Sequence, residues 1–164
     1  MALIFLLLTA LAAFAQEPHR CAACHIESVA DFKTHTHASS GIDCGICHGP
    51  SEKHRTSVGN VPPDQVAAPA DVSKLCGNCH LAEKQQYENS AHGRVYTNGK
   101  KVRTANCNTC HGHHALRPWA AQSANCQRCH TTLPASCKEK PLSVNSRVAC
   151  MSCHARHTLA VSGR

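Results

Sequence analysis

Cys76-Gly77-Asn78-Cys79-His80 is one of six copies of a single frame, in which two cysteines three positions apart are followed at once by histidine. Every Cys-x-x-Cys in the 164 residues has this histidine. The frame cysteines are Cys21 and Cys24, Cys44 and Cys47, Cys76 and Cys79, Cys107 and Cys110, Cys126 and Cys129, and Cys150 and Cys153. The frame histidines are His25, His48, His80, His111, His130 and His154.

The frame has the spacing that covalent haem attachment requires. Two cysteines three apart on one helical turn face the same way and can form thioethers to the two vinyl groups of one haem. The next residue then lies beneath the iron and supplies an imidazole nitrogen as proximal ligand. Zinc sites, iron–sulfur clusters and disulfides also use cysteine pairs, but none of them requires histidine at the same place six times. The frames therefore predict six covalently bound c-type haems.

The chain has too few large apolar side chains for an ordinary core. Beyond the N-terminal apolar run its aromatic residues are Phe32, Tyr87, Tyr96 and Trp119. A chain of this length normally buries many more such side chains. We therefore expect the haem macrocycles to form the apolar interior, with the polypeptide as a wrapper around them.

Residues 2–15 form an apolar run that ends in Ala13-Phe14-Ala15, an A-x-A cleavage pattern. The run is shorter than the roughly 20 residues that span a bilayer. We interpret residues 1–15 as a cleaved signal peptide, which predicts a periplasmic or extracellular protein. The alternative is an uncleaved membrane anchor formed by residues 2–15.

The formal net charge of +7 comes from dispersed basic residues. The tight basic cluster at Lys100-Lys101-Val102-Arg103 has no interleaved aromatic residues, so we expect no nucleic-acid partner. Six haems would bring about twelve propionate carboxylates. The basic residues are better interpreted as their counter-charge.

The frames form pairs, and the pairs repeat. In each of the first two pairs a histidine lies twelve residues after the first frame histidine, at His37 and at His92, whereas the third pair has Leu142 there. Helix-forming composition predicts helices over Ile26–Thr34 and Leu81–Ser90. The predicted organisation is di-haem module 1 over 16–56, a linker over 57–74, di-haem module 2 over 75–117 and di-haem module 3 over 118–164.

Eight histidines lie outside the frames, which is enough to give every iron a second imidazole. Methionine, the other usual distal ligand, occurs only as Met1 and Met151. His35 and His113 are the expected non-ligands. The distal candidates are His19, His37, His54, His92, His114 and His157.

Cys137, the thirteenth cysteine, belongs to no frame. It lies seven residues after His130, as Phe32 and Tyr87 do after their frame histidines. Three interpretations stay open: a buried inert thiol, a link to another subunit, or a thiolate ligand. A degenerate single-thioether haem site at Cys137-Lys138 is a fourth alternative.

The arrangement resembles multihaem c-type cytochromes built from di-haem repeats. That group includes the tetrahaem cytochromes of ammonia oxidation and the quinol dehydrogenase cytochromes. The resemblance rests on the paired frames, on Ser90-Ala91-His92-Gly93 after His80, and on Gly112-His113-His114 after His111. It implies a fold of mainly short α-helices and loops wrapped around stacked haems, with little or no β-sheet, and a role in electron transfer.

The expected function is an exported hexahaem cytochrome that passes electrons through closely packed, low-potential bis-histidine haems in anaerobic or respiratory metabolism. It would be a carrier with no catalytic residues, and its partners would be redox proteins or quinol-linked donors. One alternative is a multihaem nitrite, hydroxylamine or sulfite reductase with one open haem. Another is a subunit of a cytochrome filament or an outer-membrane conduit, in which the chain would form an oligomer.

Overall fold

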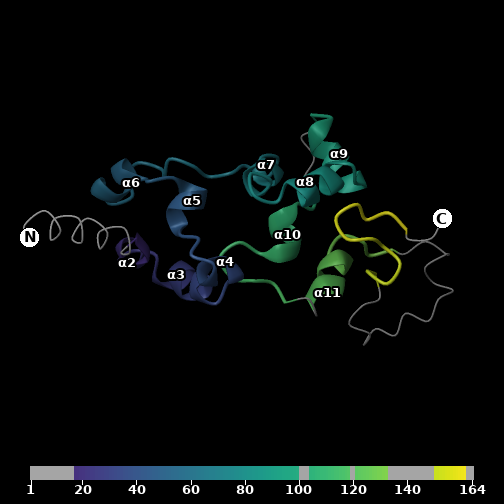
Figure 1. The fold of residues 1–164 in the computed structure, drawn as a ribbon, viewed down its shortest axis with the longest axis horizontal. Coiled ribbons are helices and arrows are strands. Elements are labelled where there is room, and N and C mark those ends of the chain that lie inside the picture. Colours follow the sequence, from purple (N-terminus) through teal and green to yellow (C-terminus); the bar gives the residue numbers. More distant parts are fainter. Residues whose placement is uncertain (1–16, 100–103, 119–120, 133–149, 162–164) are drawn as a thin grey trace, which may run out of the picture. The chain divides into compact units, whose positions relative to one another are not determined.

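The computed structural model describes residues 17–99, 104–118, 121–132 and 150–161 (Figure 1). The expected signal peptide, Trp119 and Cys137 lie outside these ranges. The helices are short and are separated by turns: α2 (Glu17–Ala22), α3 (Ile26–Lys33), α4 (Thr36–Ser39), α5 (Cys44–His48), α6 (Glu52–Thr56), α7 (Val72–Cys76), α8 (Leu81–Glu88), α9 (Ala91–Thr97), α10 (Cys107–His111) and α11 (Gln122–Gln127).

The two helices predicted after the first and third frames are confirmed. α3 and α8 each begin directly after the frame histidine, and His25 and His80 have similar backbone angles at that position. Both helices end one or two residues before their predicted limits. They end there because the chain turns within two or three residues to begin α4 or α9.

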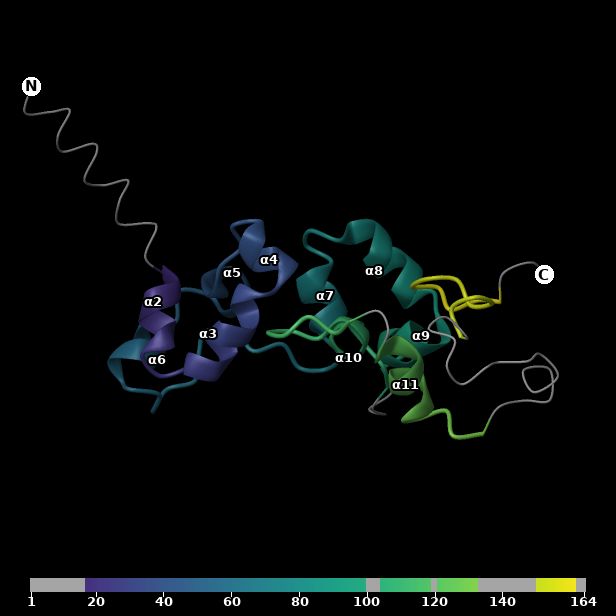
Figure 2. The same cartoon turned by 90° about the horizontal axis from the view of Figure 1, so that it is seen from below.

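The chain divides into two compact units, and the first contains residues 1–66 together with 113–116. Within it α2 packs against α3 and α5, and α3 packs against α4 (Figure 2). The unit carries the first two frames. Its sequence boundary at residue 66 falls inside the segment predicted as a linker, while the division into three di-haem modules stays a prediction.

The second unit contains residues 67–112 and 117–164. Its helices form a contiguous series in which α7 contacts α8 and α10, α8 contacts α9, and α10 contacts α11. The approach of α9 to α8 requires glycine at position 93. A Cβ atom there would lie 2.0 Å from the carbonyl oxygen of Tyr87.

The apolar core made by side chains is very small. Among the described residues Val29, Val72 and Tyr87 are the buried apolar side chains. The Tyr87 hydroxyl donates a hydrogen bond of 2.9 Å to the carbonyl oxygen of Ala105. By contrast Ile26 and Leu81, which follow frame histidines, are 70 % and 56 % exposed in the polypeptide. Large apolar side chains next to the frames are thus left exposed by the polypeptide, as expected if haem macrocycles cover them.

The described residues contain no β-strand beyond bridge contacts, such as the isolated bridge between His154 and Val161. The expected fold class of short helices and loops with little or no sheet is confirmed. None of the helices within the described ranges is long and apolar enough to cross a membrane.

Candidate haem sites

All six frames place their histidine one turn after their first cysteine. In four frames the histidine N–H donates to the carbonyl oxygen of that cysteine, at 2.9 to 3.0 Å. These four are the frames of His25, His80, His130 and His154. The other two frames are helical from end to end and form α5 and α10. In both forms a single turn carries two thiols and an imidazole, which is the arrangement that attachment of one haem needs.

The two helical frames share a local design. Asp43 caps α5 by accepting a hydrogen bond from the Ile46 N–H at 3.1 Å. Asn106 caps α10 in the same way, accepting from the Thr109 N–H at 3.1 Å, and the Thr109 hydroxyl oxygen accepts from the Asn106 N–H at 3.1 Å. A glycine with positive φ follows the histidine in both frames. These caps fix where each frame begins, and therefore where its thiols lie.

The first cysteines of successive frames contact each other in three pairs. In each pair one thiol raises the pKa of the other: Cys21 acts on Cys44, Cys76 on Cys107, and Cys150 on Cys126. Burial, followed by the neighbouring cysteine, raises the pKa of both Cys44 and Cys126 to about 11. The hydrogen bond with Cys76 is the main cause that raises the pKa of Cys107. Each contact joins the two frames of one predicted module.

Four frame histidines each lie opposite a histidine from outside the frames. The ring centres are 5.9 Å apart in His25–His54, 6.0 Å in His48–His114, 5.9 Å in His130–His92 and 6.0 Å in His111–His157. Sequence symmetry singled out all four outer histidines as ligand candidates. It did not show which iron each would reach.

These separations fit an iron held between two imidazoles. A metal-bound nitrogen lies about 2.0 Å from the metal and about 1.1 Å from its ring centre, so two axial rings are centred about 6 Å apart. Two half-buried arginines have a free donor suited to a haem propionate, although Arg55 also pairs with Glu52. The Nε atoms of Arg55 and Arg117 are buried with no hydrogen-bond partner among the described residues. A carboxylate could accept from each of them.

Three imidazoles are oriented by backbone carbonyls. Nδ1 of His48 lies 3.1 Å from the carbonyl oxygen of Gln65, Nδ1 of His54 lies 2.7 Å from that of Val61, and Nδ1 of His154 lies 2.8 Å from that of Leu159. A carbonyl oxygen can only accept, so each Nδ1 carries the proton. Nε2 is then left as the metal-binding nitrogen, with the outer hydrogen bond typical of metal-ligating histidine.

Burial favours the neutral form of three further imidazoles. Desolvation is the largest cause that lowers the pKa of His92, His111 and His114. A neighbouring histidine adds to the effect in each case: His130, His157 and His113 respectively. Since only neutral imidazole binds a metal, a lowered pKa favours the form of these three rings that can coordinate haem iron.

The histidines twelve residues after a frame occupy equivalent places. His37 is the second residue of α4, and His92 is the second residue of α9. His35, an expected non-ligand, is buried and caps α4: its Nδ1 accepts from the His37 N–H at 3.1 Å. Ser90 does the same for α9, accepting from the Gly93 N–H at 3.0 Å. The spacing of the frames does indicate this capping role of His35, because residues 35 and 90 both lie ten positions after a frame histidine.

The remaining predicted positions are less completely described. His19 lies in α2, but its side chain is not among those described, and Cys137 and Leu142 lie outside the described ranges. The His113 and His114 rings are 4.9 Å apart, and only His114 faces a frame histidine in the contacts above. Within the described residues no cluster of three or more acidic, cysteine or histidine side chains forms a conventional metal site.

Residues 29–112, about half of the chain, match the family described as cytochrome c7 and related cytochrome c. The matched stretch contains the second, third and fourth frames in full. No curated protein and no solved structure matches the chain. The resemblance to multihaem c-type cytochromes is confirmed by the family match. The chain therefore belongs to the family of cytochrome c7 and related c-type cytochromes, whose covalently bound haems carry electrons.

Proposed function

We propose that the protein is an exported hexahaem electron carrier in which every iron has two axial histidines. The four imidazole pairs, each with one frame histidine and one outer histidine at about 6 Å, are the observation that supports it most directly. Thioethers from the six cysteine pairs would hold the haems. Bound haem supplies a reversible one-electron couple, and the chain positions and insulates it.

Contacts between frames support a chain of neighbouring haems. The thiol contacts bring together the frames of His25 and His48, of His80 and His111, and of His130 and His154. The ligand pairs then cross from one predicted module to the next. His114, after the fourth frame, faces His48 of the second, and His92, after the third frame, faces His130 of the fifth. Haems whose two ligands come from different modules would lie close to one another and could pass electrons along a series.

Bis-histidine ligation implies low reduction potentials, because a methionine ligand would raise them. Neither Met1 nor Met151 suits a distal role, since one lies in the proposed signal peptide and the other inside a frame. The carrier would serve anaerobic or respiratory chemistry in the periplasm or outside the cell. Its partners would be redox proteins or quinol-linked donors, and it would not bind nucleic acid. Residues 2–15 would direct export.

The decisive experiment combines mass spectrometry with EPR of the oxidised protein. Denatured protein from a host competent in cytochrome maturation should carry six haem masses of about 616 Da each. EPR should then show low-spin ferric iron for all six haems. A lower haem count would refute the hexahaem assignment. A stoichiometric high-spin signal would instead favour a reductase with one open haem.

A further inference from the structure

Residues 57–65 lie against His48 and His54, two of the proposed axial histidines of the first unit. The Val61 carbonyl accepts from Nδ1 of His54, and the Gln65 carbonyl accepts from Nδ1 of His48. The Gln65 N–H also donates to the His48 carbonyl oxygen at 3.2 Å. The segment predicted as a linker therefore begins with a loop that contacts ligands of two different haems.

The start of the loop is tied to α6. The Gly59 N–H donates to the His54 carbonyl oxygen at 2.9 Å. The Ser57 hydroxyl donates to the same carbonyl at 3.2 Å and accepts from the Val61 N–H at 3.0 Å. Val58 has a φ of +52°, an unfavourable angle for a β-branched residue, which persists only where neighbouring contacts hold it.

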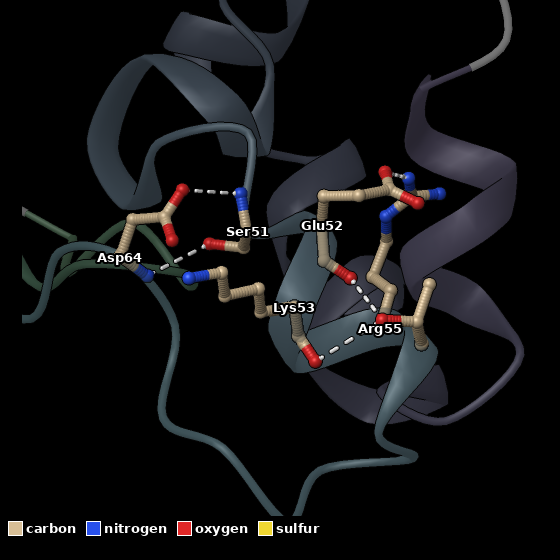
Figure 3. A network of polar contacts seen from close by, with 6 residues as sticks. Ser51, Glu52, Lys53, Arg55 and Asp64 are labelled. Atoms are coloured by element: carbon tan, nitrogen blue, oxygen red, sulfur yellow. Dashed lines mark hydrogen bonds and ion pairs between the residues drawn. The ribbon is translucent and has the colours of Figure 1, made fainter.

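Asp64 anchors the end of the loop (Figure 3). Its carboxylate accepts from the Ser51 N–H at 2.7 Å, and its own N–H donates to the Ser51 hydroxyl oxygen at 3.1 Å. Ser51 is buried, has a φ of +51°, and donates through its hydroxyl to the His48 carbonyl at 2.7 Å. Gly49 leaves the room that this approach needs, because a Cβ there would lie 3.0 Å from the Asp64 Cβ.

We infer that Asp64 is a positioning residue, which through the 57–65 loop orients His48 and His54 toward two irons and lowers the potentials of both haems. The inference rests on the proposed bis-histidine ligation. His54 faces His25, and His48 faces His114, so a single loop acts on the first and second haems together. Neither Asp64 nor the loop would act on the irons directly. Both act through the carbonyls that accept from Nδ1.

The direction of the effect follows from the hydrogen bonds. A proton shared from Nδ1 to a carbonyl makes the imidazole a stronger electron donor to its metal. Stronger donation stabilises ferric over ferrous iron, so the potential falls. Loss of the anchor should therefore raise the potential of the two haems. A neutral hydrogen bond contributes about 1 kcal/mol, equivalent to a shift of about fivefold in the redox equilibrium, or about 40 mV at 59 mV per tenfold change.

The test compares Asp64→Ala, Asp64→Asn and Asp71→Ala in the full-length holoprotein. Asp64→Asn keeps an oxygen that can accept from the Ser51 N–H. Asp71 is the matched control, because it is exposed and its side chain makes no capping bond to α7. Redox titration and EPR of all six haems are measured beside the haem count. We expect two of six haem equivalents to move upward in Asp64→Ala, with changed low-spin g-values, and none to move in the other two variants.

Wild-type titration and EPR separate this inference from the proposed function. If the wild-type protein lacks six low-spin haems, the ligation proposal fails first. If it has them and Asp64→Ala titrates like wild type, the positioning role fails alone. An equal shift in Asp64→Asn would assign the effect to charge and would also overturn it. If Asp64→Ala does not accumulate, Ser57→Ala is the second variant, because it removes the hydroxyl that contacts the His54 carbonyl and the Val61 N–H. It should raise the potential of one haem equivalent. An unchanged titration of Ser57→Ala would refute the role of the loop.

Discussion

At the scale of single residues, neighbouring histidines have different roles. His35 is buried and uses Nδ1 to cap a helix, while His37, two positions later, occupies the place that His92 holds in the second repeat. His113 and His114 are adjacent, yet His114 is the one that faces His48. The local fold therefore gives neighbouring histidines different surroundings, which their abundance in the sequence does not reveal.

His114→Ala should convert one haem from low-spin to high-spin, because it removes the imidazole opposite His48. His113→Ala is the matched control and should leave all low-spin signals in place. EPR of the oxidised variants measures both, and added imidazole should restore the low-spin signal in His114→Ala. Equal behaviour of the two variants would show that the ring separation does not reflect ligation.

At the scale of helices, the repeat consists of a frame, a two-turn helix, a capped short helix and a second frame. α3 with α4 and α8 with α9 follow this plan, and α5 and α10 close it with a capped frame. These helices are too short to be stable alone. Their caps and the covalent haem attachment must compensate, so single capping residues should have measurable effects.

Asn106→Ala should lower the free energy of unfolding by about 1 kcal/mol, because it removes the side-chain oxygen that accepts from the Thr109 N–H at the start of α10, while the backbone N–H of residue 106 can still donate to the Thr109 hydroxyl. Urea unfolding followed by haem absorbance would measure the loss as a lower midpoint. Asp71→Ala should leave the midpoint unchanged, since the Asp71 side chain makes no capping bond although it precedes α7. A midpoint unaffected by Asn106→Ala would mean that the haem alone fixes this frame.

Local sequence was sufficient to predict the frames and the helices after His25 and His80, because these features depend on spacings of a few residues. The lack of sheet, confirmed for the described residues, was an expectation from the family resemblance. The partner of each frame histidine could not be predicted in the same way. His54 lies close in sequence to the frame of His48 but faces His25, and His92 faces His130. Such pairings depend on the path of the whole chain, which sequence symmetry does not describe.

At the scale of the whole molecule, the polypeptide provides little interior of its own. The buried apolar side chains among the described residues are Val29, Val72 and Tyr87, and apolar residues beside the frames are exposed. At roughly 25 cal/mol per Å² of buried apolar area, three such side chains cannot offset the conformational entropy of the chain. The haem macrocycles must supply most of the apolar contact that stabilises the fold.

The haem-free chain should therefore lack cooperative unfolding. Expression without cytochrome maturation, followed by limited proteolysis and thermal melting, tests this. In a competent host, Cys126→Ser with Cys129→Ser should remove one haem mass and increase protease sensitivity around His130. A protease-resistant haem-free chain with a sharp melting transition would contradict the role of haem as the core.

Reduction should change the electrophoretic mobility of the whole protein. The polypeptide has a formal charge of +7. With about twelve propionates and one positive charge on each ferric centre, the oxidised protein would carry about +1 and the fully reduced protein about −5. Native electrophoresis under controlled potential should show migration toward the anode only after reduction. Reduction removes one positive charge per haem whatever charge the propionates carry, so equal mobility of the two forms would contradict the predicted change of about six charges.

Residues 113–116 belong to the first unit although residues 67–112 of the second unit precede them in sequence. If export and haem attachment proceed from the N-terminus, His54 would reach the first haem soon after the frame of His25 has been exported. The second haem, for which we propose His114 as the distal ligand, would then wait until residue 114 has crossed the membrane. During that interval its iron would have a vacant coordination position, exposed to whatever small molecules the compartment contains. During maturation the second haem would thus pass through a stage in which its iron can bind small molecules, and the rate of translocation would set how long that stage lasts.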